Sequence, residues 1–489
     1  MNAEDYIIAV DAGTANITVL AGKQTEDGRV EIVTGVITES DGLMRGDIKN
    51  IELSTKAIKA AINDVESELG IEIKDVVVGM SGSGIKCTRQ QGYVFIENND
   101  DELGEVKESD LNALSRTIRN AQVSSSEHII HISAQSYAID GDKDIKQPIG
   151  IMGKKLEGEF NIVTNDKEAV SRMDKCLQRV GVKPVGYVLN SIAAAEAVLT
   201  EDEKELGVVV VDIGAGTTDI AVYHDNIVKY VAVIPIGGEL INKDICQTGV
   251  LNRLAENLKI KGVAMYEKAP NTMLPIPTMG QSAKKAISTR NLSMIIEARL
   301  MDIIEATLNE LNKSGYAGKL EAGVVLTGGT AHFDHIDELF SKHMNMPVRI
   351  ASYSPNVAVG ENTFYNDLSY MTAMGILVKS CNDGLKTYTK SKPKAVEVVE
   401  EQPVQSVQEK YVADKEEEYE EYENEEENED SDIEETPTKS EKSKDESGNA
   451  FFGFLSKIRK KFGDILEVVD DTPDSDDSNN NKSSNYKNL

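Results

Sequence analysis

The sequence predicts a mixed α/β fold of two or more domains, followed by a long polar extension. With 489 residues, the chain is too long for a single hydrophobic core. Up to about residue 385, short β-branched runs bounded by Gly or Asp alternate with segments that carry apolar residues at helical spacing. Such alternation of strands and helices is typical of layered α/β proteins.

Composition narrows the function classes. The net charge of −31 argues against general nucleic-acid binding, which needs a basic surface. No apolar run is as long as a membrane-spanning helix, and the acidic N-terminus lacks the pattern of a signal peptide. The cysteines are scattered, which favours reduced thiols over disulfides or a zinc site; they are Cys87, Cys176, Cys246 and Cys381.

The expected elements of the folded part follow from these patterns. Short runs of β-branched residues predict buried strands at 6–10, 76–79, 208–211 and 324–327. Apolar residues at helical spacing predict helices at 54–69 and 294–311. Between about 83 and 162, shorter strand and helix patterns predict a small α+β unit of its own.

Three glycine-rich turns recur far apart in the chain, in segments 6–22 (YIIAVDAGTANITVLAG), 208–223 (VVVVDIGAGTTDIAVY) and 323–333 (GVVLTGGTAHF). In the first two, an apolar strand ends in Asp, Gly and Thr form a tight turn, and an apolar strand resumes. Glycine lets the backbone approach a phosphate, whose oxygens then bind successive N–H groups and a Thr hydroxyl. One such turn alone would be read as an ordinary β-turn, but two copies and a third glycine pair favour a phosphate site.

The aspartates of the two hairpins predict a second kind of contact. Asp11 and Asp212 cannot bind phosphate directly because both partners are negative, but they can hold Mg²⁺ through water. Neither a GxxxxGK[ST] loop nor a GxGxxG turn that opens a helix is present, so the P-loop and Rossmann classes are not indicated.

With these motifs, the chain resembles the actin/Hsp70/sugar-kinase superfamily and, within it, the FtsA family of bacterial cell division proteins. The similarity extends from about residue 5 to 385 and is strongest in segments 193–223 and 325–329. It implies an actin-like (ribonuclease H-like) two-domain ATPase fold that binds ATP and Mg²⁺. The implied organisation is subdomain 1A in two parts (1–82 and 163–204), an inserted subdomain 1C (83–162), subdomain 2A in two parts (205–234 and 311–390, the latter with a closing helix) and subdomain 2B (235–310).

The resemblance assigns a role to each matching residue. The first phosphate hairpin would use Asp11, Gly13 and Thr14, and the second would use Asp212, Gly214, Gly216 and Thr217. The adenosine would lie against Gly328, Gly329 and Thr330. The segment 255–262 (AENLKIKG) resembles the helix that contacts base and ribose, which makes Glu256 and Lys259 candidates; the alternative is that both lie on a solvated helix face.

The chain departs from its relatives where hydrolysis would be catalysed. Superfamily members that hydrolyse ATP well carry Glu or Gln before the second hairpin, where this chain has Asn190. Asn cannot accept a proton, although it can orient a water molecule. Glu196 follows on the next helix and is expected at the surface, and Asn16 replaces a frequent Lys. We therefore expect ATP binding with weak or absent hydrolysis, and no residue is assigned as catalytic.

Two histidine pairs have spacings that raise the question of a metal site. His128 and His131 lie in an expected strand, where alternation would put them on opposite faces, and His332 and His335 have no third ligand. We expect neither pair to bind a metal.

The last hundred residues change character. Residues 391–489 hold 13 Lys and Arg against 29 Asp and Glu, so about one fifth of the chain carries about half of the net charge. Residues 391–449 show no apolar period, which predicts a disordered acidic linker, and 470–489 form a second disordered polar tail.

Between them, residues 450–469 predict an amphipathic membrane-binding helix. On a helical wheel one arc collects Phe451, Phe454, Leu455, Ile458, Phe462, Ile465 and Leu466, with Arg459 and Lys461 at its two margins. This pattern suits a helix that lies in the membrane interface, with the long cations reaching the lipid headgroups. The alternative is a helix docked on a protein. FtsA proteins usually end with such a helix, whereas about 20 polar residues follow it here.

The resemblance finally implies a partner set and a location. Subdomain 2B (235–310) would bind the C-terminal peptide of the tubulin-like protein FtsZ, and the chain would self-associate into filaments and recruit other divisome proteins. It would act at the division septum, on the inner face of the cytoplasmic membrane. A related actin-like scaffold of a pilus or secretion system, and a metabolic kinase or Hsp70-type chaperone, are the alternatives.

Overall fold

The computed structural model describes residues 6–97, 103–120, 124–276, 285–358, 367–391 and 467–468. All but the first residue of the predicted linker (391–449), nearly all of the predicted amphipathic helix and the polar tail (470–489) lie outside the described residues. Among the described helices, none is both long enough and apolar enough to cross a membrane.

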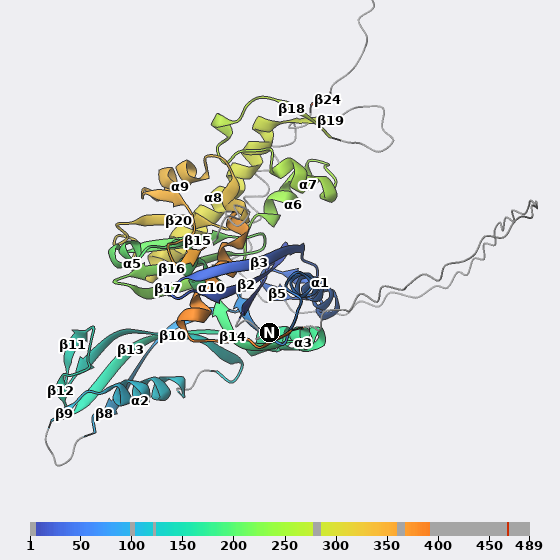
Figure 1. Cartoon of the computed structure of the whole chain (residues 1–489). Helices are drawn as coiled ribbons and strands as arrows, with labels where there is room; N and C mark the ends of the chain where they lie inside the picture. The colour runs from blue at the N-terminus through green and yellow to red at the C-terminus, as the bar shows by residue number, and fades with distance from the viewer. Residues whose placement is uncertain are drawn as a thin grey trace, which may run out of the picture. The chain divides into compact units, whose positions relative to one another are not determined.

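Two central sheets carry the fold (Figure 1). The first has the order β14-β7-β1-β2-β3-β22, with strands β14 (Lys183–Leu189), β7 (Asp75–Met80), β1 (Ile7–Ala12), β2 (Asn16–Gln24), β3 (Val30–Glu39) and β22 (Val357–Ala358). The second has the order β17-β16-β15-β20-β21, with strands β17 (Ile227–Ile234), β16 (Thr218–His224), β15 (Val208–Ile213), β20 (Gly323–Thr327) and β21 (Val348–Ile350). Their central strands are fully buried, as expected for runs of Val and Ile covered on both faces.

The helices are more extensive than the sequence pattern predicted. The helix expected at 54–69 begins three residues earlier as α1 (Ile51–Leu69), because Asn50 caps it by accepting from the amides of Glu52 and Leu53. The helix expected at 294–311 is α8 (Thr289–Ser314), capped by Ser288 and ended by Gly315 in the left-handed region. The other helices are α3 (Lys167–Val180), α4 (Asn190–Val198), α5 (Glu201–Leu206), α6 (Glu239–Gln247), α7 (Asn252–Lys259), α9 (Ile336–Met344) and α10 (Met371–Asn382).

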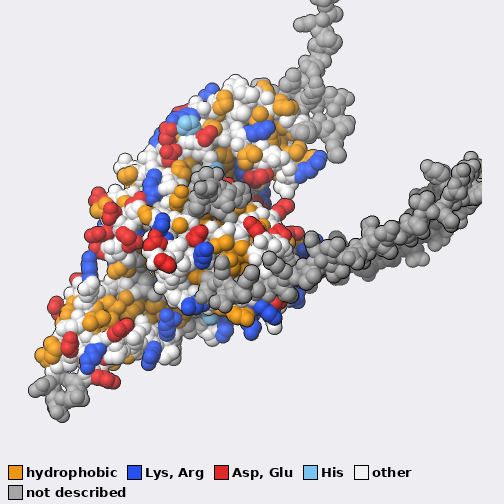
Figure 2. Space-filling view, in the orientation of Figure 1, with side chains coloured by type: hydrophobic (Ala, Val, Ile, Leu, Met, Phe, Trp, Pro, Cys, Tyr) orange, Lys and Arg blue, Asp and Glu red, His pale blue; other side chains and the backbone are white. Residues whose placement is uncertain are grey.

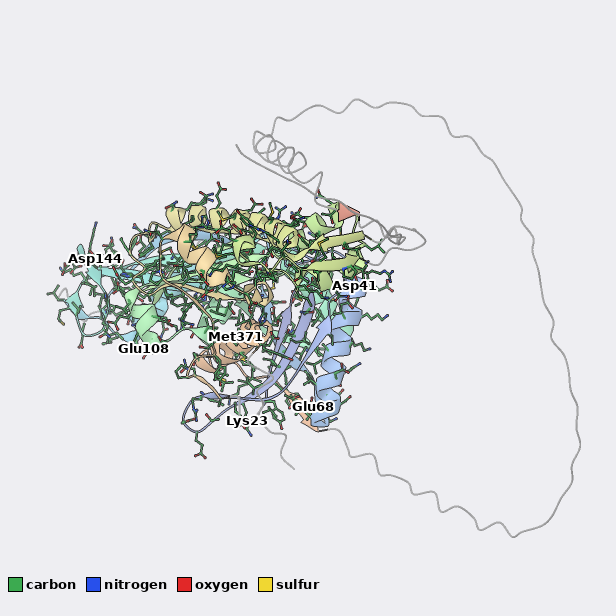
Figure 3. All side chains as sticks on the ribbon, turned by 90° about the horizontal axis from the view of Figure 1, so that it is seen from above. Lys23, Asp41, Glu68, Glu108, Asp144 and Met371 are labelled. Atoms are coloured by element: carbon green, nitrogen blue, oxygen red, sulfur yellow. The ribbon has the colours of Figure 1, made fainter. Side chains whose placement is uncertain are left out.

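The two sheets repeat one construction. β1 and β2 pair over six residue pairs from Ile7↔Gly22 to Ala12↔Ile17, and β15 and β16 pair over six from Val208↔Tyr223 to Ile213↔Thr218. In each sheet a parallel strand pairs with the first strand of the hairpin: β7 pairs with β1, and β20 pairs with β15. α4 and α10 pack against each other between the sheets, and a Cβ on Gly375 would lie only 1.6 Å from the carbonyl oxygen of Ala193. Figure 3 marks the start of this closely packed helix α10 at Met371.

The insertion after β7 folds as a separate α+β unit, at the lower left of Figure 1. Its four-stranded sheet has the order β11-β10-β13-β8, with β11 (Asp142–Ile145), β10 (Glu127–Ile139), β13 (Lys155–Asp166) and β8 (Lys86–Phe95). Helix α2 (Glu108–Arg119) covers one face, and its Leu114 and Ile118 are buried against Phe160 and Ile162. The strands β9 (Gly104–Glu105) and β12 (Met152–Gly153) form a small pair beside it.

The inserted unit is bonded to the edge of the second sheet through two β-bulges. In β17 the pairing with β16 skips Lys229, and in β10 the pairing with β13 skips Gln135. The side-chain amide of Gln135 donates to the carbonyl of Val228 (2.8 Å), and that of Asn161 donates to the carbonyl of Lys229 (2.8 Å). Both amides are at least nine-tenths buried, so they satisfy edge carbonyls that the sheet itself leaves unpaired.

The region 235–310 contains α6, α7, most of α8, and the strands β18 (Met273–Ile276) and β19 (Lys285–Ser288). A third strand from the C-terminal segment, β24 (Glu467–Val468), pairs with β19. Because Glu467 and Val468 pair with Ala286 and Lys285 as a strand, the prediction that the C-terminal helix continues to residue 469 is wrong at its end. The residues assigned to the membrane, Phe451 to Leu466, lie outside the described part of the chain.

Candidate phosphate-binding cleft

The tips of the two glycine hairpins meet. In each tip a glycine amide closes the turn at the same distance: Gly13 N donates to Asn16 O and Gly214 N donates to Thr217 O, both at 2.9 Å. A Cβ on Gly216 would lie 2.3 Å from Thr14 Oγ1, so only glycine allows the hairpins to approach this closely. The structure therefore brings together two turns that are about 200 residues apart in sequence.

The third glycine turn joins the second hairpin. Gly328 has a φ of 86°, and a Cβ there would lie 2.2 Å from Asp212 Oδ1. Thr330 donates its hydroxyl to the carbonyl of Gly214 at 3.1 Å. The predicted residues Gly328, Gly329 and Thr330 thus lie directly beside Asp212 and Gly214.

The side chain of Asn190 points at Asp11, and its amide group is already used in a hydrogen bond to that residue. As the first residue of α4, it donates through Nδ2 to Asp11 Oδ1 at 3.0 Å. Its own buried Oδ1 accepts no hydrogen bond from a described residue and lies against Gly79, where a Cβ would be 2.4 Å away. Glu196, expected at the surface, is instead partly buried and ion-paired with Lys204, so that expectation is wrong.

Asp212 receives the corresponding hydrogen bond from the other central helix. Thr372, the second residue of α10, donates to Asp212 Oδ2 at 2.7 Å. The sequence analysis missed Thr372 because it lies about 160 residues beyond its partner.

Asp219 is a third carboxylate of the cleft that the sequence analysis missed. It is 4% exposed and accepts hydrogen bonds from Ser81 (2.7 Å) and Thr217 (2.9 Å). The signal was present: Asp219 pairs with Asp212 across the second hairpin, where the first hairpin pairs Thr18 with Asp11. Ser81 comes from the end of β7 in the first sheet, so this hydrogen bond also joins the two halves of the molecule.

The three carboxylates oppose one another's ionisation. Burial and the charge of Asp212 raise the pKa of Asp11 to about 7, and burial raises the pKa of Asp212 to about 6. Burial, then repulsion from Asp212, raises the pKa of Asp219 to about 7. Carboxylates in this situation gain stability from a cation placed among them.

The residues suit a hydrated magnesium ion and a chain of phosphates. No described group of three or more His, Cys, Asp or Glu side chains is arranged to chelate a metal directly. Mg²⁺ commonly keeps several waters, and carboxylates that reach it through water are a frequent arrangement. Phosphate oxygens would fit the glycine tips, which offer the backbone N–H groups that do not close the turns and the hydroxyl of Thr14.

Other predicted residues are not joined to the phosphate turns. Glu256 and Lys259 form an ion pair with each other (2.7 Å), and Glu256 also accepts from Asn242 (2.7 Å). Glu256 is exposed, as the solvated-face alternative expects, whereas the Lys259 side chain is only 12% exposed. A base or ribose contact by either residue stays a prediction.

Both histidines of the second pair contact carboxylates. His332 pairs with Asp367 (3.1 Å), and His335, at the N-cap position of α9, pairs with Glu338 (2.8 Å). His332 ends a 3-10 turn and His335 precedes α9, so the two do not lie on one helix. Burial lowers the pKa of His131 to about 4, which keeps that ring neutral near pH 7.

Comparison with known proteins decides the family. The model for the cell division protein FtsA matches residues 209–375, and that for the SHS2 domain inserted in FtsA matches residues 82–164. The cell division protein FtsA of Neisseria meningitidis serogroup B is 35% identical over 380 residues, which cover 77% of this chain and 90% of that protein. The chain belongs to the FtsA family of cell division proteins.

Further relatives agree with this membership. The cell division protein FtsA of Bacillus subtilis is 31% identical over 390 residues, 78% of this chain and 85% of that protein. Among solved structures, the PilM-PilN type IV pilus biogenesis complex matches with a TM-score of 0.55 at 13% identity, covering 77% of this FtsA-family chain and 98% of that one. The predicted actin-like fold with an inserted domain is confirmed.

Proposed function

We propose that this FtsA-family protein binds ATP with Mg²⁺ in the cleft and polymerises on the inner face of the cytoplasmic membrane, where it tethers FtsZ and helps to recruit the divisome at the septum. The observation that carries the nucleotide part is the convergence of three glycine turns and three carboxylates at one place. The remaining parts rest on membership of the family and on the sequence of the C-terminal segment.

The residues of the cleft divide the work of binding. The tip amides that do not close the turns, together with the hydroxyl of Thr14, would hold phosphate oxygens, while Gly328 to Thr330 would face the adenosine. The hydroxyl of Thr217 donates to Asp219 and so helps to position that carboxylate. Asp11, Asp212 and Asp219 would hold the waters of Mg²⁺, which supplies positive charge against the phosphates. Thr372, Asn190 and Ser81 keep these carboxylates in place.

Hydrolysis is expected to be slow, because the residue before the second hairpin is an amide. Asn190 cannot take a proton from water, and its Nδ2 is engaged with Asp11. We expect steady-state phosphate release below about one turnover per minute, far under the typical range of enzymes. Release well above that rate, and lost in Asp212→Asn, would contradict the slow-switch interpretation.

Membrane attachment is assigned to the segment 450–469. Its four phenylalanines (including Phe452) supply apolar surface for the interface, and its basic residues each add about 1 kcal/mol near anionic lipid. We expect the full chain to co-sediment with liposomes and Phe454→Glu/Phe462→Glu to lose most of that binding. Tyr486→Glu, in the polar tail, is the matched control and should bind as the natural chain does; equal binding by all three would remove this segment as the anchor.

Partner binding is assigned to 235–310 for the FtsZ C-terminal peptide. In vesicles that carry the full chain, we expect recruitment of a labelled FtsZ C-terminal peptide, and none with vesicles alone. The alternative is a pilus-type scaffold, since the fold is similar to that in the PilM-PilN complex. A peptide that stays in solution while the chain binds the vesicles would indicate this alternative.

Self-association and divisome contacts can use the inserted unit, whose surface carries apolar side chains at the lower left of Figure 2. Among them are Tyr93 (53% exposed), Phe95 (71%), Leu103 (50%) and Met152 (53%). Apolar groups gathered on one surface commonly mark a protein contact.

A further inference from the structure

The turns that form the proposed nucleotide site carry no positively charged side chain. The turns at 11–18, 212–219, 236–239 and 327–332 contain no Lys or Arg, while they contribute the buried Asp212 and Asp219 and the partly buried Asp11. A polyphosphate would therefore meet amides, hydroxyls and negative charge, with Mg²⁺ as the one positive group.

A two-residue hairpin lies against the point where the glycine tips meet. The strands β4 (Leu43–Met44) and β5 (Asp47–Ile48) pair, and Arg45 and Gly46 form the turn. The amide nitrogen of Arg45 would be 2.9 Å from a Cβ on Gly216, and Gly46 N lies 3.4 Å from Thr14 Oγ1. The turn thus contacts both phosphate hairpins at once.

Arg45 is an unusual residue for this turn. Its φ is 53° and that of Gly46 is 73°, so both central residues are left-handed, as in a type I′ turn. Asn, Asp or Gly is preferred at the first of these positions, and other residues are strained there. Local backbone strain of this kind is concentrated at functional sites.

Ion pairs fix the backbone of the Arg45–Gly46 turn, whereas the guanidinium of Arg45 has no partner among the described residues. Asp47 accepts a two-pronged hydrogen bond from Arg172 of α3 (2.7 and 2.8 Å to Nη2) and pairs with Lys49 at 2.7 Å. Arg45 itself is exposed and forms no hydrogen bond or ion pair with any described residue. A fixed backbone with an uncommitted guanidinium suits a phosphate contact, because arginine donates several hydrogen bonds to one phosphate.

We infer that Arg45 is the cationic contact for the terminal phosphate of the nucleotide and so distinguishes a triphosphate from a diphosphate. This inference rests on the proposed nucleotide site. A terminal phosphate bound by both tips would lie beside the point where they meet, and the Arg45 turn contacts both tips there.

The test compares ATP and ADP binding, with Mg²⁺, by isothermal titration of the full chain and three variants. Arg45→Asn removes the charge and places a preferred residue in the turn, so its melting temperature should equal or exceed that of the natural chain. We expect it to bind ATP roughly tenfold more weakly and ADP within about threefold. Arg45→Lys should keep most of the ATP affinity. Lys59→Ala, an equal charge change on the exposed face of α1, is the control and should bind both nucleotides normally.

The outcomes separate this inference from the proposed site. If the natural chain binds both nucleotides and Arg45→Asn binds ATP equally well, the role of Arg45 is refuted while the site stands. Equal weakening of ATP and ADP would also refute it, since the residue would then not select the triphosphate. If the natural chain binds neither nucleotide, both the inference and the proposed site fail.

Discussion

The first and second glycine hairpins have the same backbone and different side-chain chemistry. Both close through a glycine amide at 2.9 Å, and in both an aspartate is the fifth of the six paired residues of the first strand. In each, the N-terminal turn of a central helix donates to that aspartate, from Asn190 in α4 and from Thr372 in α10. Opposite the aspartate, however, the first hairpin carries Thr18 and the second carries Asp219.

The difference indicates which half of the cleft carries which task. The second hairpin holds two of the three carboxylates and also contacts the Gly328 turn, so it concentrates the demand for a cation. The first hairpin contributes one carboxylate and the hydroxyl of Thr14. The two hairpins thus share one backbone, but the second carries two carboxylates where the first carries one.

The largest expected effect comes from the meeting point of the tips. Gly216→Ala would put a Cβ 2.3 Å from Thr14 Oγ1 and 2.9 Å from Arg45 N, which forces the tips apart. We expect ATP affinity to fall about 100-fold. Gly13→Ala is the matched change in the first hairpin; its Cβ would meet only the carbonyl of Asn16 at 2.9 Å, and we expect a smaller loss. A calorimetric titration that gives equal losses would contradict the asymmetry of the contact.

The next effect is on the pH dependence of the ligand-free protein in EDTA. The folded pKa of Asp219, about 7, lies above its ordinary value of 3.8, so the folded state binds the proton more tightly. This contribution to stability is complete below about pH 4 and is lost as the pH rises to about 7. We expect Asp219→Asn to flatten the fall in the free energy of unfolding over that range, on the order of 2 kcal/mol, as measured by urea unfolding. Thr18→Val, its counterpart, should leave the pH profile unchanged; a profile equally steep in Asp219→Asn would refute the assignment.

A third comparison concerns the cation. We expect Asp219→Asn to reduce the gain in ATP affinity that Mg²⁺ provides by roughly tenfold, because one of three carboxylates no longer attracts the hydrated ion. Titrations with Mg²⁺ and with EDTA, in this variant and in Thr18→Val, measure the gain. An unchanged gain would place Asp219 outside the cation site.

The smallest effect separates the two supporting hydrogen bonds. Thr372→Val keeps the shape of the side chain and leaves Asp212 without its donor, which we expect to cost about 1 kcal/mol of stability. Asn190→Ala removes the bond to Asp11 but also removes a buried oxygen that lacks a described partner, so its cost should be lower. Chemical denaturation of both variants near neutral pH tests the order, and the reverse order would contradict it.

The sequence predicted the backbone of this site better than its side-chain network. Asp11, Asp212 and the glycines were identified because tight turns between buried strands have a local signature. Thr372 and Ser81 act through helix and strand ends that reach the site only after the two sheets pack, and no local pattern predicts them. Asn190 was identified from the family resemblance, but its hydrogen bond to Asp11 was not. Asp219 could have been predicted, because the pairing of the two strands of the second hairpin alone places it opposite Asp212. The bulges that join Gln135 and Asn161 to β17 likewise depend on tertiary contact.

The central claim is that the two hairpins form one nucleotide site, and isothermal titration of the full chain with ATP tests it most directly. We predict saturable binding of one ATP per chain, weaker in EDTA than with Mg²⁺, and strongly reduced in Gly216→Ala. Absence of saturable binding by the folded natural chain at ATP concentrations up to about 1 mM, which corresponds to about 4 kcal/mol, would contradict the account.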